Sequence, residues 1–245
     1  MKFVKMHGLG NDFVVVDADV HLNADLIRRL CDRHFGVGAD GVLSIGVTDG
    51  MVTMGYWNAD GSAAEMCGNG LRCIARLAVD RGLAAAGRFE VRTPAGVKRV
   101  EVGAEVRVDL GMPVLGDGIE YQSRFFRTVD VGNPHAVTEV DDVDRVPVDD
   151  VGRALQDQFP NGVNVEFVTF GEAEVKMRVW ERGVGETLAC GSGIVAAAAV
   201  ARRAGGGDGI TVTMPGGTAR VEFEDGGAWL VGPADYVFDG TWNPH

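Results

Sequence analysis

The chain of 245 residues is written twice, and this internal repeat limits its possible folds more than any other feature of the sequence. The stretch V-T-M-G-Y-W-N-A-D-G-S-A-A-E-M-C-G-N-G recurs as V-K-M-R-V-W-E-R-G-V-G-E-T-L-A-C-G-S-G. In both copies a tryptophan precedes a cysteine by ten residues, so Cys67 and Cys190 occupy equivalent positions 123 residues apart.

Two shorter blocks repeat in the same order along the chain. The pair G-N at 10–11 recurs at 132–133, and R-V-E at 99–101 recurs at 220–222. Three collinear blocks indicate a duplication, because chance would give one block at most. We therefore predict two pseudo-symmetric domains, residues 1–113 and 114–233, with a C-terminal tail at 234–245.

The fold class expected for each half is α/β (α+β), with a β-sheet or barrel wrapped around one central helix. Alternating polar and apolar residues predict hairpins over 97–110 and 218–231. Small apolar residues after each C-G-x-G predict helices at 71–81 and 194–203, with Gly82 and Gly205 as stops. A further amphipathic helix is expected from a cap at Asn23 to about His34.

The two repeated cysteines stand at predicted helix starts and are flanked by glycines. A helix start offers unpaired N–H groups and a positive dipole end, which stabilise a thiolate or a bound carboxylate. Two such thiols facing one carbon from opposite sides satisfy the need of stereoinversion, in which one face loses a proton and the other gains one. We therefore predict an amino-acid epimerase in which Cys67 and Cys190 are the base and the acid.

The same residue type has a plainer role elsewhere, since most cysteines are small buried apolar residues. We assign that role to Cys31 and to Cys73, whose repeat counterpart is Ala196. The spacing from Cys67 to Cys73 does not match a zinc motif, and no phosphate or dinucleotide fingerprint occurs. The sequence predicts no metal and no cofactor.

Charge and composition limit the partners. A net charge of −12 argues against nucleic acid and anionic membranes, and no apolar stretch reaches the length of a membrane span. Four cysteines without a secretory signal favour free thiols in a reducing cytoplasm. The expected partner is a small-molecule substrate.

Five motifs along the chain are H-G-L-G-N-D-F, N-A-D-G-S-A-A-E-M-C-G-N-G-L-R-C, G-N-P-H-A-V, G-V-N-V-E-F and W-E-R-G-V-G-E-T-L-A-C-G-S-G. Together they resemble diaminopimelate epimerase. The resemblance covers essentially the whole chain. It implies interconversion of LL- and meso-diaminopimelate without cofactor, for lysine and cell-wall synthesis. It also implies two similar α/β domains, a tail that returns to the first, and a homodimer.

The resemblance implies further site residues around the two cysteines. His135 and Glu181 match the groups that tune the acid and base. The matches to the distal end of the substrate are Asn11, Asn58, Asn164 and Arg182, and the matches to the cradle of the reacting carboxylate are Gly68, Asn69, Gly191 and Ser192. Glu181, next to Arg182, is also expected to contact substrate.

This chain departs from the family pattern at two positions, and two alternative functions stay open. Many family members have glutamine where this chain has Gly41, and threonine where it has Ser192. A proline or hydroxyproline racemase, or a non-catalytic redox or binding protein on the same fold, would share the duplication, whereas a cysteine-less isomerase is excluded by the cysteines. The repeat also pairs Phe13 with His135 and Asn58 with Glu181, so we expect the two thiols to be electrostatically unequal.

Overall fold

A computed structural model describes residues 1–171 and 174–243. The chain divides into two compact units, Met1–Val108 with Gly232–His245, and Asp109–Val231. The first boundary falls before the expected one because Leu110 donates to the carbonyl of Ala228, which in turn donates to Gly111, so these residues belong with the second unit. Residues 172, 173, 244 and 245, which include the end of the predicted tail, lie outside the description.

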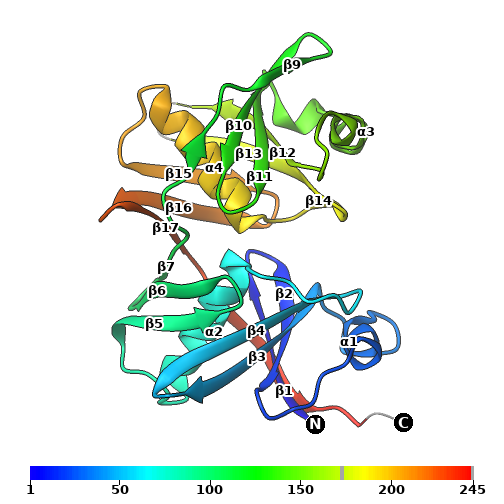
Figure 1. The fold of residues 1–245 in the computed structure, drawn as a ribbon, viewed down its shortest axis with the longest axis vertical. Coiled ribbons are helices and arrows are strands. Elements are labelled where there is room, and N and C mark those ends of the chain that lie inside the picture. Colours follow the sequence, from blue (N-terminus) through cyan, green and yellow to red (C-terminus); the bar gives the residue numbers. More distant parts are fainter. Residues whose placement is uncertain (172–173, 244–245) are drawn as a thin grey trace. The chain divides into compact units, whose positions relative to one another are not determined.

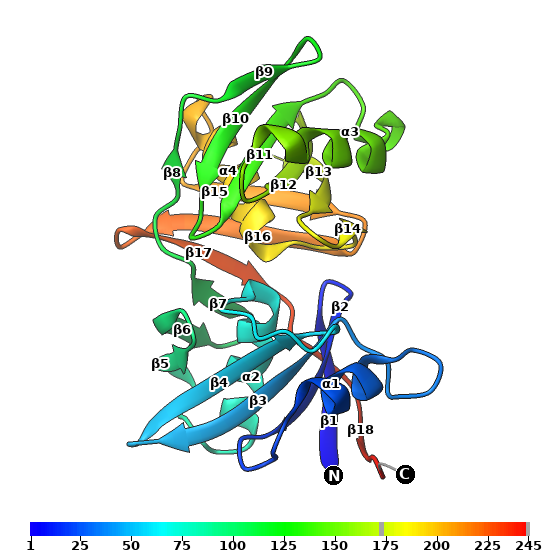
Figure 2. The same ribbon diagram turned by 45° about the vertical axis from the view of Figure 1, so that its right-hand side comes forward.

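The first unit is a mixed sheet whose strands alternate between antiparallel and parallel neighbours (Figure 1). The antiparallel pairs are β1 (Lys2–Gly8) with β2 (Asn11–Asp17), β3 (Gly41–Thr48) with β4 (Met51–Asn58), and β5 (Gly87–Thr93) with β6 (Gly96–Val102), which also pairs with β7 (Val106–Asp109). The parallel joins are β2 with β3 and β4 with β5. Strand β18 (Asp235–Thr241), from the tail, lies antiparallel beside β1 (Figure 2).

The second unit repeats this order. Its antiparallel pairs are β10 (Arg124–Asp130) with β11 (Pro134–Glu139), β12 (Asn164–Phe170) with β13 (Glu174–Glu181), and β15 (Gly209–Met214) with β16 (Gly217–Glu224), which also pairs with β17 (Gly227–Gly232). The parallel joins are β11 with β12 and β13 with β15. Short strands β8 (Val114–Leu115), β9 (Ile119–Tyr121) and β14 (Gly185–Thr187) are added at β10 and β13. The duplication read from the sequence is therefore present in the strand order.

One long helix lies at the centre of each unit. Helix α2 (Gly68–Asp80) contacts β1, β2, β3, β4 and β6, and helix α4 (Gly191–Arg203) contacts β10 to β13, β15 and β16. Strands far apart in one sheet reach the same helix only if the sheet curves around it, as expected. The other face of each sheet carries a shorter helix, α1 (Ala24–Cys31) in the first unit and α3 (Val148–Leu155) in the second. Two 3₁₀ turns flank α3: η1 (Val143–Arg145) comes before it and η2 (Gln156–Gln158) follows it.

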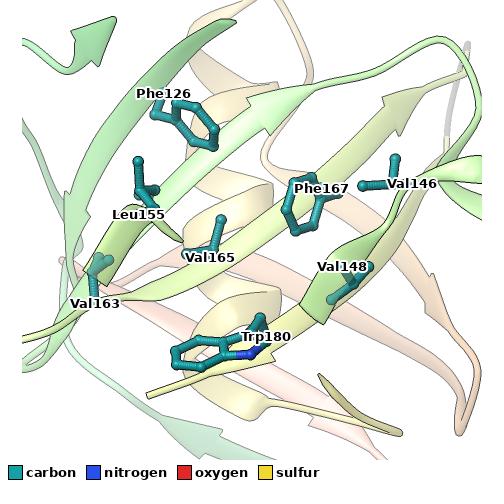
Figure 3. Packing of buried hydrophobic residues seen from close by; sticks show 9 residues of the cluster. Phe126, Val146, Val148, Leu155, Val163, Val165, Phe167 and Trp180 are labelled. Atoms are coloured by element: carbon teal, nitrogen blue, oxygen red, sulfur yellow. The ribbon is translucent and has the colours of Figure 1, made fainter. Parts of the chain in front are cut away.

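A hydrophobic core holds α3 against its face of the sheet in the second unit. Figure 3 shows Phe126, Val165, Phe167 and Trp180 of the sheet meeting Leu155 of α3. All five side chains are almost fully withdrawn from solvent. Burying such side chains contributes about 1.5–3 kcal/mol each, so α3 is held by packing that its eight residues would not provide alone. No helix in the described parts of the chain is long and apolar enough to cross a membrane.

Helices α2 and α4 end at the predicted glycines but begin earlier than predicted. Gly82 (φ +69°) and Gly205 (φ +107°) follow the last residues of α2 and α4 in a backbone conformation that favours glycine. Both helices begin three residues earlier than predicted, because the cysteine side chain itself caps the first turn.

Helix α1 is shorter than predicted at its C-terminal end. It is capped by Asn23 as expected but ends at Cys31, not near His34. The carboxylate of Asp32 accepts the N–H groups of His34 and Phe35, both at 2.8 Å. This local turn competes with another helical turn, which is why the apolar pattern alone overestimates the length.

Candidate active site

The two repeated cysteines have the same local geometry. Cys67 and Cys190 are the N-cap residues of α2 and α4, in extended backbone conformation, and each sulfur accepts the N–H three residues on at 3.4 Å. The acceptors therefore lie at the positive end of a 13-residue helix. A thiolate formed there gains a hydrogen bond and a favourable dipole in either unit.

The other two cysteines lack this setting. Cys31 and Cys73 are buried, and burial raises the pKa of their thiols to about 11 and about 12. Neither stands at a helix start, since both lie within α1 and α2. They are packing residues, as the sequence predicts.

Amide groups and one arginine surround Cys67. Its sulfur lies 3.5 Å from Oδ1 of Asn11, which also accepts from Asn69 at 3.3 Å. Asn69 in turn accepts from Nη2 of Arg72 at 2.8 Å, and the guanidinium also donates to the carbonyl of Pro233 at 3.1 Å. Arg72 is fully buried, so it forms a cationic support beneath the start of α2.

Acidic groups surround Cys190 instead. Its sulfur lies 3.6 Å from Oγ of Ser192, and burial, reinforced by the charges of Glu181 and Glu166, raises the pKa of the thiol well above its usual range. Burial also raises the pKa of Glu181, against the hydrogen bond from Thr187 at 2.5 Å. The raised pKa favours the protonated form of Cys190.

His135 lies one step further from Cys190. Its Nδ1 lies 2.6 Å from Oε1 of Glu166, and its Nε2 lies 3.0 Å from Oδ1 of Asn133. Asn133 donates to Oγ of Ser192 at 3.4 Å. A continuous chain of hydrogen bonds thus joins the imidazole to the residue that contacts the Cys190 sulfur.

The remaining predicted residues, Asn58, Asn164 and Arg182, bind backbone groups or the Ser62 hydroxyl. Nδ2 of Asn164 donates to the carbonyl of Pro134 at 3.0 Å, and its Oδ1 accepts from the N–H of Arg182 at 3.0 Å. The Arg182 guanidinium donates to the carbonyl of Asn161. Asn58, the last residue of β4, donates to Oγ of Ser62 at 3.0 Å.

Gly41 stands opposite Asn58 in the β3–β4 ladder. A Cβ at this position would lie 2.6 Å from the carbonyl of Trp57 and 2.9 Å from the ring of Tyr56. A side chain at this position would therefore have to displace both the Trp57 carbonyl and the Tyr56 ring.

The structure thus brings most predicted residues into two clusters, one per unit. Asn11, Cys67, Gly68 and Asn69 lie together in the first, and His135, Glu181, Cys190, Gly191 and Ser192 in the second. Asn58, Asn164 and Arg182 lie at strand ends, with Arg182 directly after Glu181.

Sequence reasoning missed Arg72, Asn133, Glu166 and Thr187. Asn133 carried a signal, because the repeat pairs it with Asn11. Glu166 carried a weaker one, as a charged residue within the apolar strand Asn164–Phe170.

Two other observations bear on ligands. Among residues 1–171 and 174–243, no group of three or more His, Cys, Asp or Glu side chains could hold a metal ion. A surface hollow of about 230 Å³ in the first unit and one of about 540 Å³ in the second are lined by no predicted site residue.

Comparison with known proteins identifies the family. The family model for diaminopimelate epimerase matches residues 3–116 and 127–237. A diaminopimelate epimerase of Xanthomonas oryzae pv. oryzae is 43% identical over 279 aligned positions, covering 99% of this chain and 96% of the relative. Among solved structures, a predicted epimerase of Pseudomonas aeruginosa superposes with a TM-score of 0.80 at 14% identity, covering 100% and 99% of the two chains. A hydroxyproline epimerase of Agrobacterium vitis gives 0.76 at 15% identity, covering 98% and 90%, which shows a shared fold alone.

Proposed function

The chain belongs to the diaminopimelate epimerase family, and we propose that it interconverts LL- and meso-diaminopimelate with Cys67 and Cys190 as its base and acid. Family membership makes it an isomerase with a role in the synthesis of lysine and peptidoglycan precursors. The proline-type alternative is supported at the level of the fold only. The two domains of the duplication are, in this proposal, the two halves of one epimerase.

The proposed reaction moves two protons. A cysteine thiolate removes the α-proton, so that the C–H bond breaks, an S–H bond forms and the electron pair stays on the carbanion. The other cysteine donates its thiol proton to the opposite face of the same carbon, and the two sulfurs exchange protonation states. The observation that carries this proposal is the pair of identical helix caps at Cys67 and Cys190.

The carbanion needs stabilisation, since a thiolate is a weak base. We assign this task to the N–H groups in the first turns of α2 and α4, at Gly68, Asn69, Gly191 and Ser192. The first N–H groups of a helix have no partner within the helix, and they favour a carboxylate whose charge grows in the transition state.

The surroundings of each cysteine support different resting states. The raised pKa of Cys190 favours a thiol, whereas Cys67 is half-buried and its charged form interacts favourably with the Arg72 guanidinium. We propose that the resting enzyme holds the thiolate at Cys67 and the proton at Cys190. His135 and Glu181 then tune Cys190 in both directions of the reaction.

The distal amino and carboxylate groups of the substrate are assigned to Asn11, Asn58 and Arg182, with Asn164 as the support of Arg182. Arg182 suits a carboxylate, because a guanidinium binds it through two hydrogen bonds. Both polar groups of the Asn164 side chain already bind backbone, so Asn164 supports Arg182 through its backbone N–H. No cofactor or metal is part of this mechanism.

We also propose a homodimer in the cytoplasm. Tyr236, Val237 and Phe238 of β18 are each about half exposed, which is a large apolar surface for one strand. Val237→Lys should shift the mass measured by light scattering toward a monomer. Val97→Lys, at an equally exposed valine, should not. The cytoplasm suits a mechanism that needs two reduced thiols.

One experiment tests the proposed function. The protein is incubated with LL-diaminopimelate in deuterated water after exhaustive chelation, and the product is analysed by NMR. We expect meso product with deuterium at the inverted carbon only. An inverted product without deuterium, or activity that returns only with added metal, would contradict the mechanism.

A further inference from the structure

Two fully buried positions hold apolar side chains in the first unit and ionisable side chains in the second. In the first unit they hold Phe13 and Leu43, and in the second they hold His135 and Glu166. The ladders correspond, because Phe13 faces Gly41 as His135 faces Asn164, with the second position two residues further along the strand. Packing alone therefore does not require a polar pair at this place in the fold.

The polar pair reaches the start of α4. A Cβ added to Gly193 would lie 2.8 Å from Oε1 of Glu166 and 3.4 Å from the Cys190 sulfur. At the equivalent Gly70, the nearest atom is a methyl group of Leu43 at 3.2 Å. The Glu166 carboxylate thus lies under the same turn whose N–H donates to Cys190.

The hydrogen bonds of His135 have a direction. Oδ1 of Asn133 is an acceptor, so Nε2 of His135 carries a proton there. Asn133 then donates through Nδ2 to Ser192, which leaves the Ser192 hydroxyl proton for the Cys190 sulfur at 3.6 Å. The carboxylate of Glu166 is also an acceptor, so Nδ1 donates to it, and the two contacts together require a proton on each ring nitrogen and fix the orientation of the ring.

We propose that Glu166 is a positioning residue for the epimerase reaction: its carboxylate accepts the proton of Nδ1 and orients His135 so that Nε2, which also carries a proton, donates to Asn133, and the chain through Ser192 donates toward Cys190. The proposal rests on the proposed function of Cys190. It assigns to Glu166 an effect through His135 and no contact with the substrate. Oε2 of Glu166 has no hydrogen-bond partner in the described part of the chain, so His135 is the group that its carboxylate serves.

Two substitutions separate orientation from charge. Glu166→Leu leaves Nδ1 without a partner, and we expect kcat to fall by about 10–100-fold, the usual effect of losing a group that orients a functional histidine, with KM unchanged. Glu166→Gln should restore most of kcat, because its amide can donate to Nδ1 and keep the proton on Nε2. In serine proteases a comparable change is damaging, because Nε2 must accept a proton there.

A double variant separates orientation from stability. His135→Phe with Glu166→Leu recreates the apolar pair of the first unit, so its melting temperature should match or exceed that of Glu166→Leu, while kcat stays low. Recovery of both stability and kcat in the double variant would overturn the proposal. So would wild-type kcat in Glu166→Leu, or a Glu166→Gln variant as slow as Glu166→Leu.

A spectroscopic measurement keeps the test independent of activity. The ¹⁵N spectrum of the His135 imidazole should show a protonated Nε2 in the wild type and in Glu166→Gln. An Nε2 without a proton in the wild type would overturn the proposal even if the enzyme is active. A wild type that does not epimerise diaminopimelate would instead refute the proposed function, and the imidazole spectrum would still decide the role of Glu166.

Discussion

The surroundings of Cys67 and of Cys190 differ although the backbone around them is the same. Both sulfurs cap a 13-residue helix at the same place in a repeated strand order. Cys67 is surrounded by the amides of Asn11 and Asn69 and by the buried Arg72, whereas Cys190 is near Glu181 and Glu166. Duplication thus kept the geometry that presents a sulfur and changed the charges that decide its protonation.

The removal of either sulfur should have the largest effect. Cys67→Ala and Cys190→Ala should each lower the epimerisation rate by at least about 10²–10⁴-fold, the usual contribution of one positioned acid or base. Each variant should still exchange the α-proton of the stereoisomer that its remaining sulfur can reach. Deuterium uptake without inversion, followed by NMR for each stereoisomer, measures this.

A matched control is available for these two variants. Cys73→Ala places in α2 the residue that α4 has at Ala196, and it should keep the wild-type rate. If Cys67→Ala or Cys190→Ala retained a comparable rate, the two-base mechanism would be wrong.

An extra methyl group should have unequal effects in the two units. Gly193→Ala pushes against the Glu166 carboxylate, and we expect a loss of about 1–3 kcal/mol in unfolding free energy, as for other overpacked sites, together with a lower kcat. Gly70→Ala meets only movable methyl groups of Leu43 and Met54, so its loss should be smaller. Urea unfolding of both variants checks the difference, and equal losses would show that the polar pair does not tighten the second site.

Removal of the Glu181 carboxylate should reduce the difference in pKa between the thiols of Cys190 and Cys67. A negative charge near a thiol disfavours its thiolate, so Glu181→Gln should lower the pKa of Cys190 and allow its alkylation at lower pH. Iodoacetamide labelling across a pH series, read by mass mapping, gives the shift. Glu186→Gln removes a carboxylate bound to Arg178 and serves as the control. Labelling of Cys190 that needs a higher pH in Glu181→Gln would contradict this explanation.

The smallest effects are expected at the helix ends. Gly82→Ala should cost about 1–2 kcal/mol, since φ +69° lies in the left-handed region. Gly205→Ala should cost more, because φ +107° lies further from any conformation that alanine adopts readily. Neither added methyl group would meet another atom, so chemical denaturation reports the backbone alone. An equal cost at both positions would mean that the local backbone adjusts.

The sequence by itself determined the duplication, the two central helices, their glycine stops and the helix-start cysteines. These features are local: they depend on residues within a few positions of each other, so composition and spacing carry them. Three helix ends were wrong for a local reason as well, because the side chains of Cys67, Cys190 and Asp32 form hydrogen bonds that move the starts of α2 and α4 and the end of α1. The tail beside β1 was predicted from the family resemblance and not from any pattern in residues 234–243.

Only the tertiary structure decided which groups surround each sulfur. Glu166 meets His135 across 31 residues of chain, and Arg72 reaches Pro233 across 161. No spacing rule predicts such contacts, because parallel pairing and the curvature of the sheet bring together residues that are far apart in the chain. A buried glutamate in an apolar strand is costly unless it is paired, and its partner becomes known only when the neighbouring strand is in place. The duplication could therefore be read from the sequence, while the chemical inequality of its halves depended on the fold.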